Sequence, residues 1–383
     1  MMKHTTSYLL ALVLLMAFGA CSSHKTDTNK QEGDTVKFKY AQLLQIVDFD
    51  DHSEVTIFNP WKPGKVLHTY TLSPVNAQPS ALNPQHSTLN PPPSTLHTPL
   101  TRSAVFTTVH CALLMSLGRQ EAIAGVADLQ YIKIPWIHQQ VAEGKIADCG
   151  GGLSPVVEKI MDIKPDAILL SPFENSGGYG KVEDLGIPII ECAEYMEPSP
   201  LARAEWMKFY GRLYGCEAQA DSLFAVVDSS YHALCDKARK LGPGRRVLID
   251  KMAGNVWYVP GGKSTIGQML KDAGGLYPWA DDDHSGSLAL PFETVLEKAA
   301  DCEVWLYRFS SKQHTTLSEL QSEFDGYKML TPFKNGEVYG CNVDMSLFYE
   351  EAPFRPDFLL DDFISIVHPD GSDHQLRYYQ KVK

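Results

Sequence analysis

The stretch AQADSLFAVVDSSYHALCDKARKL, residues 218–241, decides the fold. It contains neither proline nor glycine, and its apolar side chains recur at helical spacing, at Leu223, Val226, Val227 and Leu234. A helix of this length spans roughly 30 Å, about the diameter of a small domain. With the similar pattern just upstream, residues 199–241 are predicted to form two consecutive helices that break at Gly215, the second of which connects two separate bodies.

Short apolar segments alternate with helical segments on both sides of this helix. Before it, strands are predicted near residues 104–107, 122–126, 167–170 and 187–191, and after it near 246–250, 256–259, 304–307 and 338–339. Short apolar strands that alternate with helices are typical of parallel sheets covered on both faces. The chain is therefore predicted to be an α/β protein.

The two halves also resemble each other. PVVEKIM at 155–161 with AILL at 167–170 matches PFETVL at 291–296 with CEVWL at 302–306, and Glu158 precedes Asp166 by the same distance as Glu293 precedes Asp301. We therefore predict an N-terminal lobe at 102–216, a connecting helix at 217–242 and a C-terminal lobe with a closing helix at 243–383. The lobes are similar, have mostly parallel sheets, and leave a ligand cleft between them.

The first residues predict export. Lys3 and His4 precede an apolar run too short to span a bilayer, and Gly19 and Ala20 then precede Cys21. This has the form of a lipoprotein signal peptide, residues 1–20, with Cys21 as the lipidated first residue of the mature chain. An ordinary cleaved signal with a chance cysteine is the alternative. The polar residues 21–35 are predicted to be a flexible tether.

Two further segments precede the lobes. Residues 36–72 alternate in polarity and are predicted to be a β leader. Residues 73–101 contain an imperfect Pro/Ser/Asn repeat, in which each copy carries one leucine and a proline that interrupts strand pairing. This segment is predicted to be a disordered insertion.

Composition excludes several classes of partner. The net charge of −12 argues against nucleic acid or an anionic membrane surface, which both favour basic patches. Seven cysteines remain besides Cys21, without zinc-finger spacing, and are expected to be mostly core thiols with at most one disulfide. GGKST at 261–265 lacks the earlier glycine of a phosphate loop, so Ser264 or Thr265 is expected to cap a helix instead. No enzyme motif is found.

The order and spacing of these segments resemble the helix-hinged substrate-binding proteins of ABC importers for ferric siderophores, haem and cobalamin. The resemblance covers roughly residues 102–369 and is carried by TTVH at 107–110, EKI at 158–160 with KPDAIL at 164–169, LGIPI at 185–189 and RPD at 355–357. It implies a periplasm-facing, membrane-anchored monomer that is not an enzyme and uses no cofactor. It also implies that Glu158 and Glu293 dock to a permease dimer, whose ATPase subunits consume ATP.

Loops that follow the strand ends are expected to form the bottom of the cleft. The candidate ligand-binding residues are Thr108, His110, Phe173, Glu174, Asn175, Tyr195, Trp257, Tyr258, Arg308 and Asp344. Trp257 and Arg308 are the strongest, because aromatic rings and one guanidinium suit a large, partly apolar, anionic chelate. Metal coordination by His110 is a minor alternative, since no spacing for a closed metal site is present.

Three functions are weighed. The first is capture of an iron chelate (ferric siderophore or haem) or of cobalamin for an ABC importer. The rivals are a lipid-anchored α/β enzyme, for which no nucleophile or cofactor loop is found, and a binding protein for a free metal ion, which would need several converging His or carboxylate ligands.

Overall fold

The computed structural model describes residues 33–75, 94–174, 178–371 and 375–383. The predicted signal peptide, Cys21, nearly all of the tether, the centre of the repeat segment and Asn175 lie outside this part of the chain. Residues 33–383 form one compact unit, and the description that follows concerns this unit. None of the helices in the described part is both long enough and apolar enough to cross a membrane.

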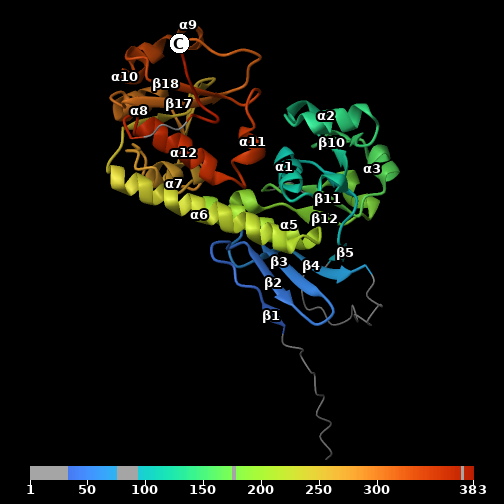
Figure 1. Ribbon diagram of the computed structural model, residues 1–383. Coiled ribbons are helices and arrows are strands. Elements are labelled where there is room, and N and C mark those ends of the chain that lie inside the picture. Colours follow the sequence, from blue (N-terminus) through green and yellow to red (C-terminus); the bar gives the residue numbers. More distant parts are fainter. Residues whose placement is uncertain (1–32, 76–93, 175–177, 372–374) are drawn as a thin grey trace, which may run out of the picture. The chain divides into compact units, whose positions relative to one another are not determined.

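The leader belongs to a five-stranded sheet (Figure 1), as its predicted strand character requires. Its strands, in spatial order, are β1 (Asp34–Thr35), β2 (Leu44–Asp48), β3 (Ser53–Phe58), β4 (Val66–Pro74) and β5 (Ser94–Thr98). The first four pair antiparallel, whereas β4 and β5 are parallel. The prediction of disorder for 73–101 was therefore wrong at both of its ends. β4 runs on to Pro74, and Leu96 of β5 is buried in the core.

The N-terminal lobe contains a five-stranded, all-parallel sheet. Its strands, in spatial order, are β12 (Ile189–Glu191), β11 (Ala167–Leu170), β6 (Ser103–Val105), β7 (Ile123–Val126) and β8 (Ala147–Asp148). The α-helices of this lobe are α1 (Thr108–Ser116), α2 (Pro135–Ala142) and α3 (Val157–Ile163). A small hairpin, β9 (Gly150–Gly151) and β10 (Ser154–Pro155), precedes α3. Both faces of the sheet are covered, since β11 contributes Leu169 to the main core and Ile168 to a second apolar cluster.

The C-terminal lobe contains two sheets, one mostly parallel and one antiparallel. The first is β13 (Val247–Ile249), β17 (Val304–Phe309), β18 (Val338–Asn342) and the antiparallel edge strand β19 (Gln380–Lys381). The second is β14 (Met252–Ala253), β15 (Val256–Pro260) and β16 (Ser287–Leu290). The α-helices are α7 (Thr265–Asp272), α8 (Phe292–Ala299), α9 (Leu317–Glu323), α10 (Thr331–Lys334), α11 (Phe348–Glu351) and α12 (Pro356–Val367). Ser264 caps α7 by accepting from the N–H of Gly267 at 3.0 Å, as predicted.

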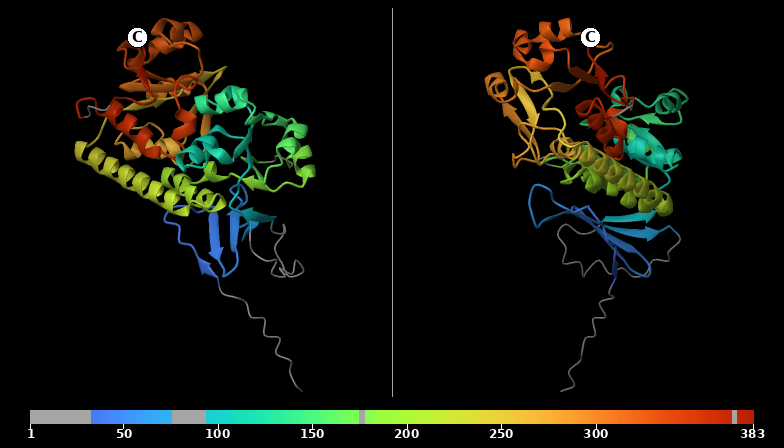
Figure 2. Two further views of the ribbon diagram at one scale, coloured as in Figure 1. Left: turned by 45° about the vertical axis from the view of Figure 1, so that its right-hand side comes forward. Right: turned by 60° about the vertical axis from the view of Figure 1, so that its left-hand side comes forward.

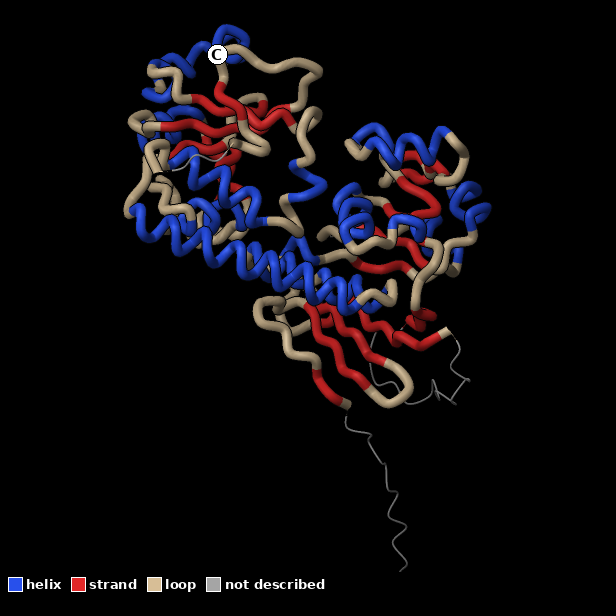
Figure 3. The backbone as a smooth tube through the Cα atoms, in the orientation of Figure 1, coloured by secondary structure: helices blue, strands red, loops and turns tan. Residues whose placement is uncertain are grey.

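A helical bridge connects the lobes (Figures 1 and 3). It consists of α4 (Pro200–Glu205), α5 (Met207–Leu213) and α6 (Glu217–Leu241). The predicted first helix is thus two helices that meet at the buried Trp206, and Gly215 forms the second break with φ +59°. Of the four apolar residues expected to face the core, Val227 is buried and Leu223 and Leu234 pack against the core, whereas Val226 is 54% exposed. The buried face of the long helix also includes Ala220, Phe224, Tyr231 and Ala238.

Buried carboxylates connect the leader to the bridge. Glu205 accepts from the backbone N–H groups of Lys39, Tyr40 and Ala41, and Glu197 accepts from those of Gln42 and Leu43. Figure 2 shows the leader sheet against the bridge helices in both of its views. The leader therefore shares one core with the rest of the unit.

All seven cysteines of the described part are free, and six of them are buried. They are core thiols, as expected.

Candidate functional site

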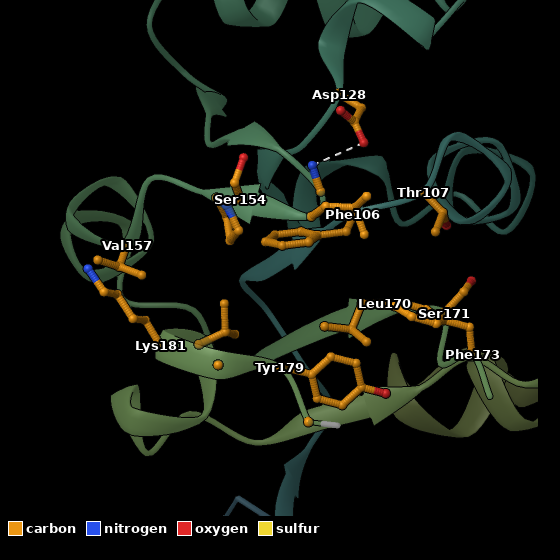
Figure 4. A pocket seen from close by; sticks show the side chains of 16 residues that line it. Phe106, Thr107, Asp128, Ser154, Val157, Leu170, Ser171, Phe173, Tyr179 and Lys181 are labelled. Carbon is orange, nitrogen blue, oxygen red and sulfur yellow. Dashed lines mark hydrogen bonds between the residues drawn. The ribbon is translucent and has the colours of Figure 1, made fainter. Parts of the chain in front are cut away.

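The first cavity lies at the carboxyl ends of the strands of the N-terminal lobe (Figure 4). Its volume is about 650 Å³. It is lined by the residues that follow β6, β7 and β11, by the β9–β10 hairpin and by residues near 178–182: Phe106, Thr107, Asp128, Gly152, Leu153, Ser154, Pro155, Val157, Leu170, Ser171, Phe173, Gly178, Tyr179, Gly180, Lys181 and Val182. Ligands of α/β proteins bind at this edge of a parallel sheet.

Large apolar side chains dominate this lobe cavity. In Figure 4 the Phe106 ring faces Leu170 and Tyr179 across the space. At the rim, Leu153 is 90% exposed and Phe173 is 50% exposed. Because soluble proteins seldom expose such side chains together, this rim is suited to contact with a partly apolar solute.

The hairpin that carries Leu153 is held by Asp128. Asp128 has a left-handed backbone, with φ 51°, and its carboxylate accepts from the N–H of Gly152 at 3.0 Å, the dashed line in Figure 4. This bond holds the hairpin tip next to the cavity.

The second cavity, of about 450 Å³, lies between the lobes. Its lining comes from α1, α4, α7, β17, α11, α12 and their flanking residues: Thr107, Thr108, Val109, Pro200, Arg203, Thr265, Ile266, Met269, Arg308, Phe348, Tyr349, Ala352, Pro353, Pro356 and Leu359. Thr107 lines this interlobe cavity and the lobe cavity alike, so the two adjoin. Together they offer the space that a bulky ligand needs.

A third, more polar hollow of about 810 Å³ lies in the C-terminal lobe beyond the end of β17. Lys312 and His314 are exposed there, and neither bonds to another residue of the described part. Ser310, also in its lining, donates to Asp344, which in turn forms an ion pair of 2.9 Å with Lys133 of the other lobe. This hollow therefore borders the contact between the lobes.

A buried carboxylate joins the two lobes directly. Glu350 of α11 is 3% exposed, and its Oε1 accepts from Thr108 Oγ1 at 2.9 Å and from the N–H of Lys133 at 3.0 Å. Its Oε2 has no hydrogen-bond partner in the described part. The contact forms beside the interlobe cavity, because Thr108 lines that cavity.

Replacing Glu350 by alanine is expected to lower the free energy of unfolding by about 2–4 kcal/mol, because a partly buried hydroxyl and a partly buried N–H lose their acceptor. Urea denaturation measures the change. Thr108→Val removes one of the two donors and should cost about 1 kcal/mol. A Glu350→Ala protein within about 0.5 kcal/mol of the wild type would contradict this account of the lobe contact.

His110 does not line either cavity. It is fully buried, its Nε2 lies 2.8 Å from the hydroxyl of Tyr210 and 3.4 Å from Glu194, and its Nδ1 contacts Thr107. The prediction that His110 contacts a ligand was therefore wrong. The reason is that its side chain points from α1 into the core, where it joins a network of polar groups.

His110, Cys192 and Glu194 place three potential metal-ligating atoms within 4.8 Å of one another. Burial raises the pKa of the Cys192 thiol well above its usual value, so the sulfur stays protonated. Burial alone would raise the pKa of Glu194, but His110 and Arg203 bring it down to about 2. His110 and Glu194 already contact each other and Tyr210 inside the core, which favours a structural role over coordination.

Trp257 is also in the core. Its side chain is 0% exposed, donates to the carbonyl of Ile249 at 2.8 Å and packs against Trp305 and Tyr327. The prediction that it contacts ligand was wrong because its ring lies on the face of β15 that packs against Phe292, Trp305 and Tyr327. Its neighbour Tyr258 is 47% exposed but lines none of the three cavities.

The other candidates divide between cavity and surface. Thr108 and Arg308 line the interlobe cavity, and Phe173 lines the lobe cavity. Tyr195 is half-buried and donates to the carbonyl of Pro172, and Glu174 is exposed outside the cavities. Asp344 takes part in the lobe contact described above.

Glu158 and Glu293 occupy matching positions. Each is the second residue of its helix, α3 and α8 respectively, and each is exposed. Neither forms a hydrogen bond or an ion pair within the described ranges, so both carboxylates are open to a partner.

Residues 107–344, more than half of the chain, match a family model described as periplasmic binding protein. The chain belongs to this family. Its members are binding proteins rather than enzymes, in agreement with the resemblance drawn from the sequence.

Individual relatives and solved structures agree with this family assignment. A lipoprotein of Methanocaldococcus jannaschii, MJ0878, is 26% identical over 91% of this chain and 87% of its own length. A periplasmic haem-binding protein of Pseudomonas aeruginosa superposes with a TM-score of 0.58 at 14% identity, over 74% of this chain and 98% of that one. The vitamin B12-binding protein BtuF of Vibrio cholerae gives 0.53 at 14%, over 72% and 99%. These likenesses show the fold: two α/β lobes with a helical hinge.

Several cavity residues were missed from the sequence. Phe106 directly follows β6, so the strand-end rule that selected Thr108 could have found it. Arg203 lies within α4, where nothing in the local pattern distinguishes a cavity arginine from a surface one.

Proposed function

We propose that this protein captures a bulky metal chelate, either a ferric siderophore or haem, or the corrinoid cobalamin, and delivers it to an ABC permease. The supporting observation is the pair of adjoining cavities that share Thr107 and are lined mainly by aromatic and aliphatic side chains. A free metal ion would need several converging carboxylate or imidazole ligands, whereas the residues lining these two cavities include one carboxylate, that of Asp128.

The proposed membrane anchor and permease contacts are taken from the sequence analysis. Cys21 carries the lipid that anchors the chain to a membrane on the periplasmic side, and Glu158 and Glu293 meet the permease. The lipoprotein relative and the family support an extracytoplasmic location. The protein acts as a monomer and binds no cofactor of its own.

Direct titration tests this function. Purified protein is titrated with haem, two ferric siderophores and cyanocobalamin by fluorescence quenching and calorimetry. Binding of one of these at micromolar or tighter Kd is expected. If none binds and ferric or zinc ion alone does, the chelate proposal fails in favour of a free-metal binding protein.

A further inference from the structure

The interlobe cavity combines an apolar lining with two guanidinium groups. Arg203 of α4 and Arg308 of β17 are its charged lining residues, and no carboxylate among the described residues lines it. The rest is mostly apolar, including Met269, Phe348 and Leu359. Charge-assisted hydrogen bonds are strongest in such a poorly hydrated setting.

The side chain of Arg203 donates no hydrogen bond to any residue that the structure describes. It is 23% exposed, and its Nε is covered and has no hydrogen-bond partner among those residues. Nη2 forms an ion pair of 4.0 Å with Glu194, which is longer than a hydrogen bond, and the Glu194 carboxylate also faces His110 and Tyr210. The covered Nε–H is costly to leave unpaired, whereas the two Nη groups are not covered and can still donate. An acceptor in the cavity would therefore complete the site.

Arg308 is held in place from behind. Its Nε and Nη2 donate to the two oxygens of Asp250 at 3.1 and 2.8 Å, and Asp250 does not line the cavity. Nη1 makes no hydrogen bond with any described residue and remains available. Because Asp250 balances much of its charge, Arg308 contributes a fixed donor more than net charge.

We infer that Arg203 and Arg308 bind an acidic group of the solute, and that the protein therefore selects an anionic chelate over an uncharged one. The acidic group, a carboxylate or a deprotonated catechol, occupies the interlobe cavity. The apolar body of the same ligand lies in the adjoining lobe cavity against Phe106, Leu153 and Phe173. This inference rests on the proposed function and narrows it.

The test compares probes of different charge on the wild-type protein. The anionic probes are haem and ferric enterobactin, and the uncharged probes are ferrichrome and cyanocobalamin. We expect an anionic probe to bind at least about tenfold more tightly than either uncharged one. Esterifying the acidic groups of haem, if haem is the probe that binds, should weaken binding by a similar factor without any change in the protein.

Substitutions then assign the effect to residues. Arg203→Met and Arg308→Met should each weaken binding of the anionic probe by about 10- to 100-fold. Arg239→Met is the matched control, because Arg239 is 74% exposed on α6 and lies outside the cavities, and its affinity should equal that of the wild type. Circular dichroism confirms that each variant is folded.

The outcomes separate the two proposals. If an uncharged probe binds as tightly as the anionic ones, or if anionic binding survives both substitutions, the anion inference is wrong and the chelate-binding function stands. If the wild type binds none of the four probes, the proposed function itself fails, and the anion inference fails with it.

Discussion

Replacing Glu205 by alanine is expected to lower the free energy of unfolding by about 3–5 kcal/mol, the range for breaking a buried charged contact. The Glu205 carboxylate is 0% exposed and accepts from the N–H groups of Lys39, Tyr40 and Ala41 at 2.9, 2.7 and 3.0 Å. Lys208 adds a further contact at 3.2 Å. Without the carboxylate, three backbone donors at the start of the leader lose their acceptor.

Urea denaturation and hydrogen exchange together measure this effect. Exchange should accelerate most in residues 36–72, because the leader loses its attachment while the lobes keep their own sheets. Glu205→Gln retains one acceptor oxygen and should fall between the wild type and the alanine variant. Glu297→Ala, which removes an exposed carboxylate from α8, serves as the control. Equal stability of Glu205→Ala and this control would show that the leader is held by other contacts.

This attachment matters because the leader lies outside the matched family region. The family model covers 107–344, yet the alignment with the M. jannaschii relative covers 91% of this chain. The leader also bonds to the N-terminal lobe through Tyr70, whose hydroxyl donates to the carbonyl of Ile189 and accepts from the N–H of Glu191. It is therefore an integral layer of the fold rather than an appended domain.

The parts of the fold that could be predicted are those that local pattern determines. The long helix at 217–241 and the alternation of strands and helices follow from hydrophobic periodicity within single segments. The parallel pairing of β4 with β5 joins Tyr70 to Ser94 across the repeat, and nothing local to 94–98 signals that partner. Pairing between distant segments is decided by tertiary packing, which a single sequence does not display.

The candidate site shows the same division. Thr108, Phe173 and Arg308 were found because they follow or end parallel strands, and the ends of such strands meet at one edge. Trp257 and His110 were misplaced because residue type suggested ligand contact while the direction of the side chain, set by neighbouring elements, pointed into the core. Arg203 was missed because its exposure to the cavity depends on how α4 packs between two lobes.

Replacing both glutamates by lysine, Glu158→Lys with Glu293→Lys, is expected to abolish delivery of the chelate to the permease. The affinity of the protein for the chelate should stay within about twofold of the wild type. Both residues are exposed, unpaired within the described ranges and equivalent by position on α3 and α8. Two equivalent carboxylates, one on each lobe, match the two-fold symmetry of a permease dimer. If these carboxylates dock to basic pockets of the permease, as the resemblance implies, the lysines would be repelled.

Delivery is measured by the growth of a deletion strain that carries each variant and receives its iron or cobalamin only as the chelate. Affinity is measured by titration of the purified proteins. The alternative is that these glutamates merely favour their helix N-termini, an effect of up to about 1 kcal/mol on stability. Glu217→Lys separates the two explanations, because Glu217 also lies in the first turn of a helix, α6, but is not one of the two matched glutamates of the lobes. If the double variant supports growth as well as Glu217→Lys does, the carboxylates have a local structural role and the permease recognises another surface.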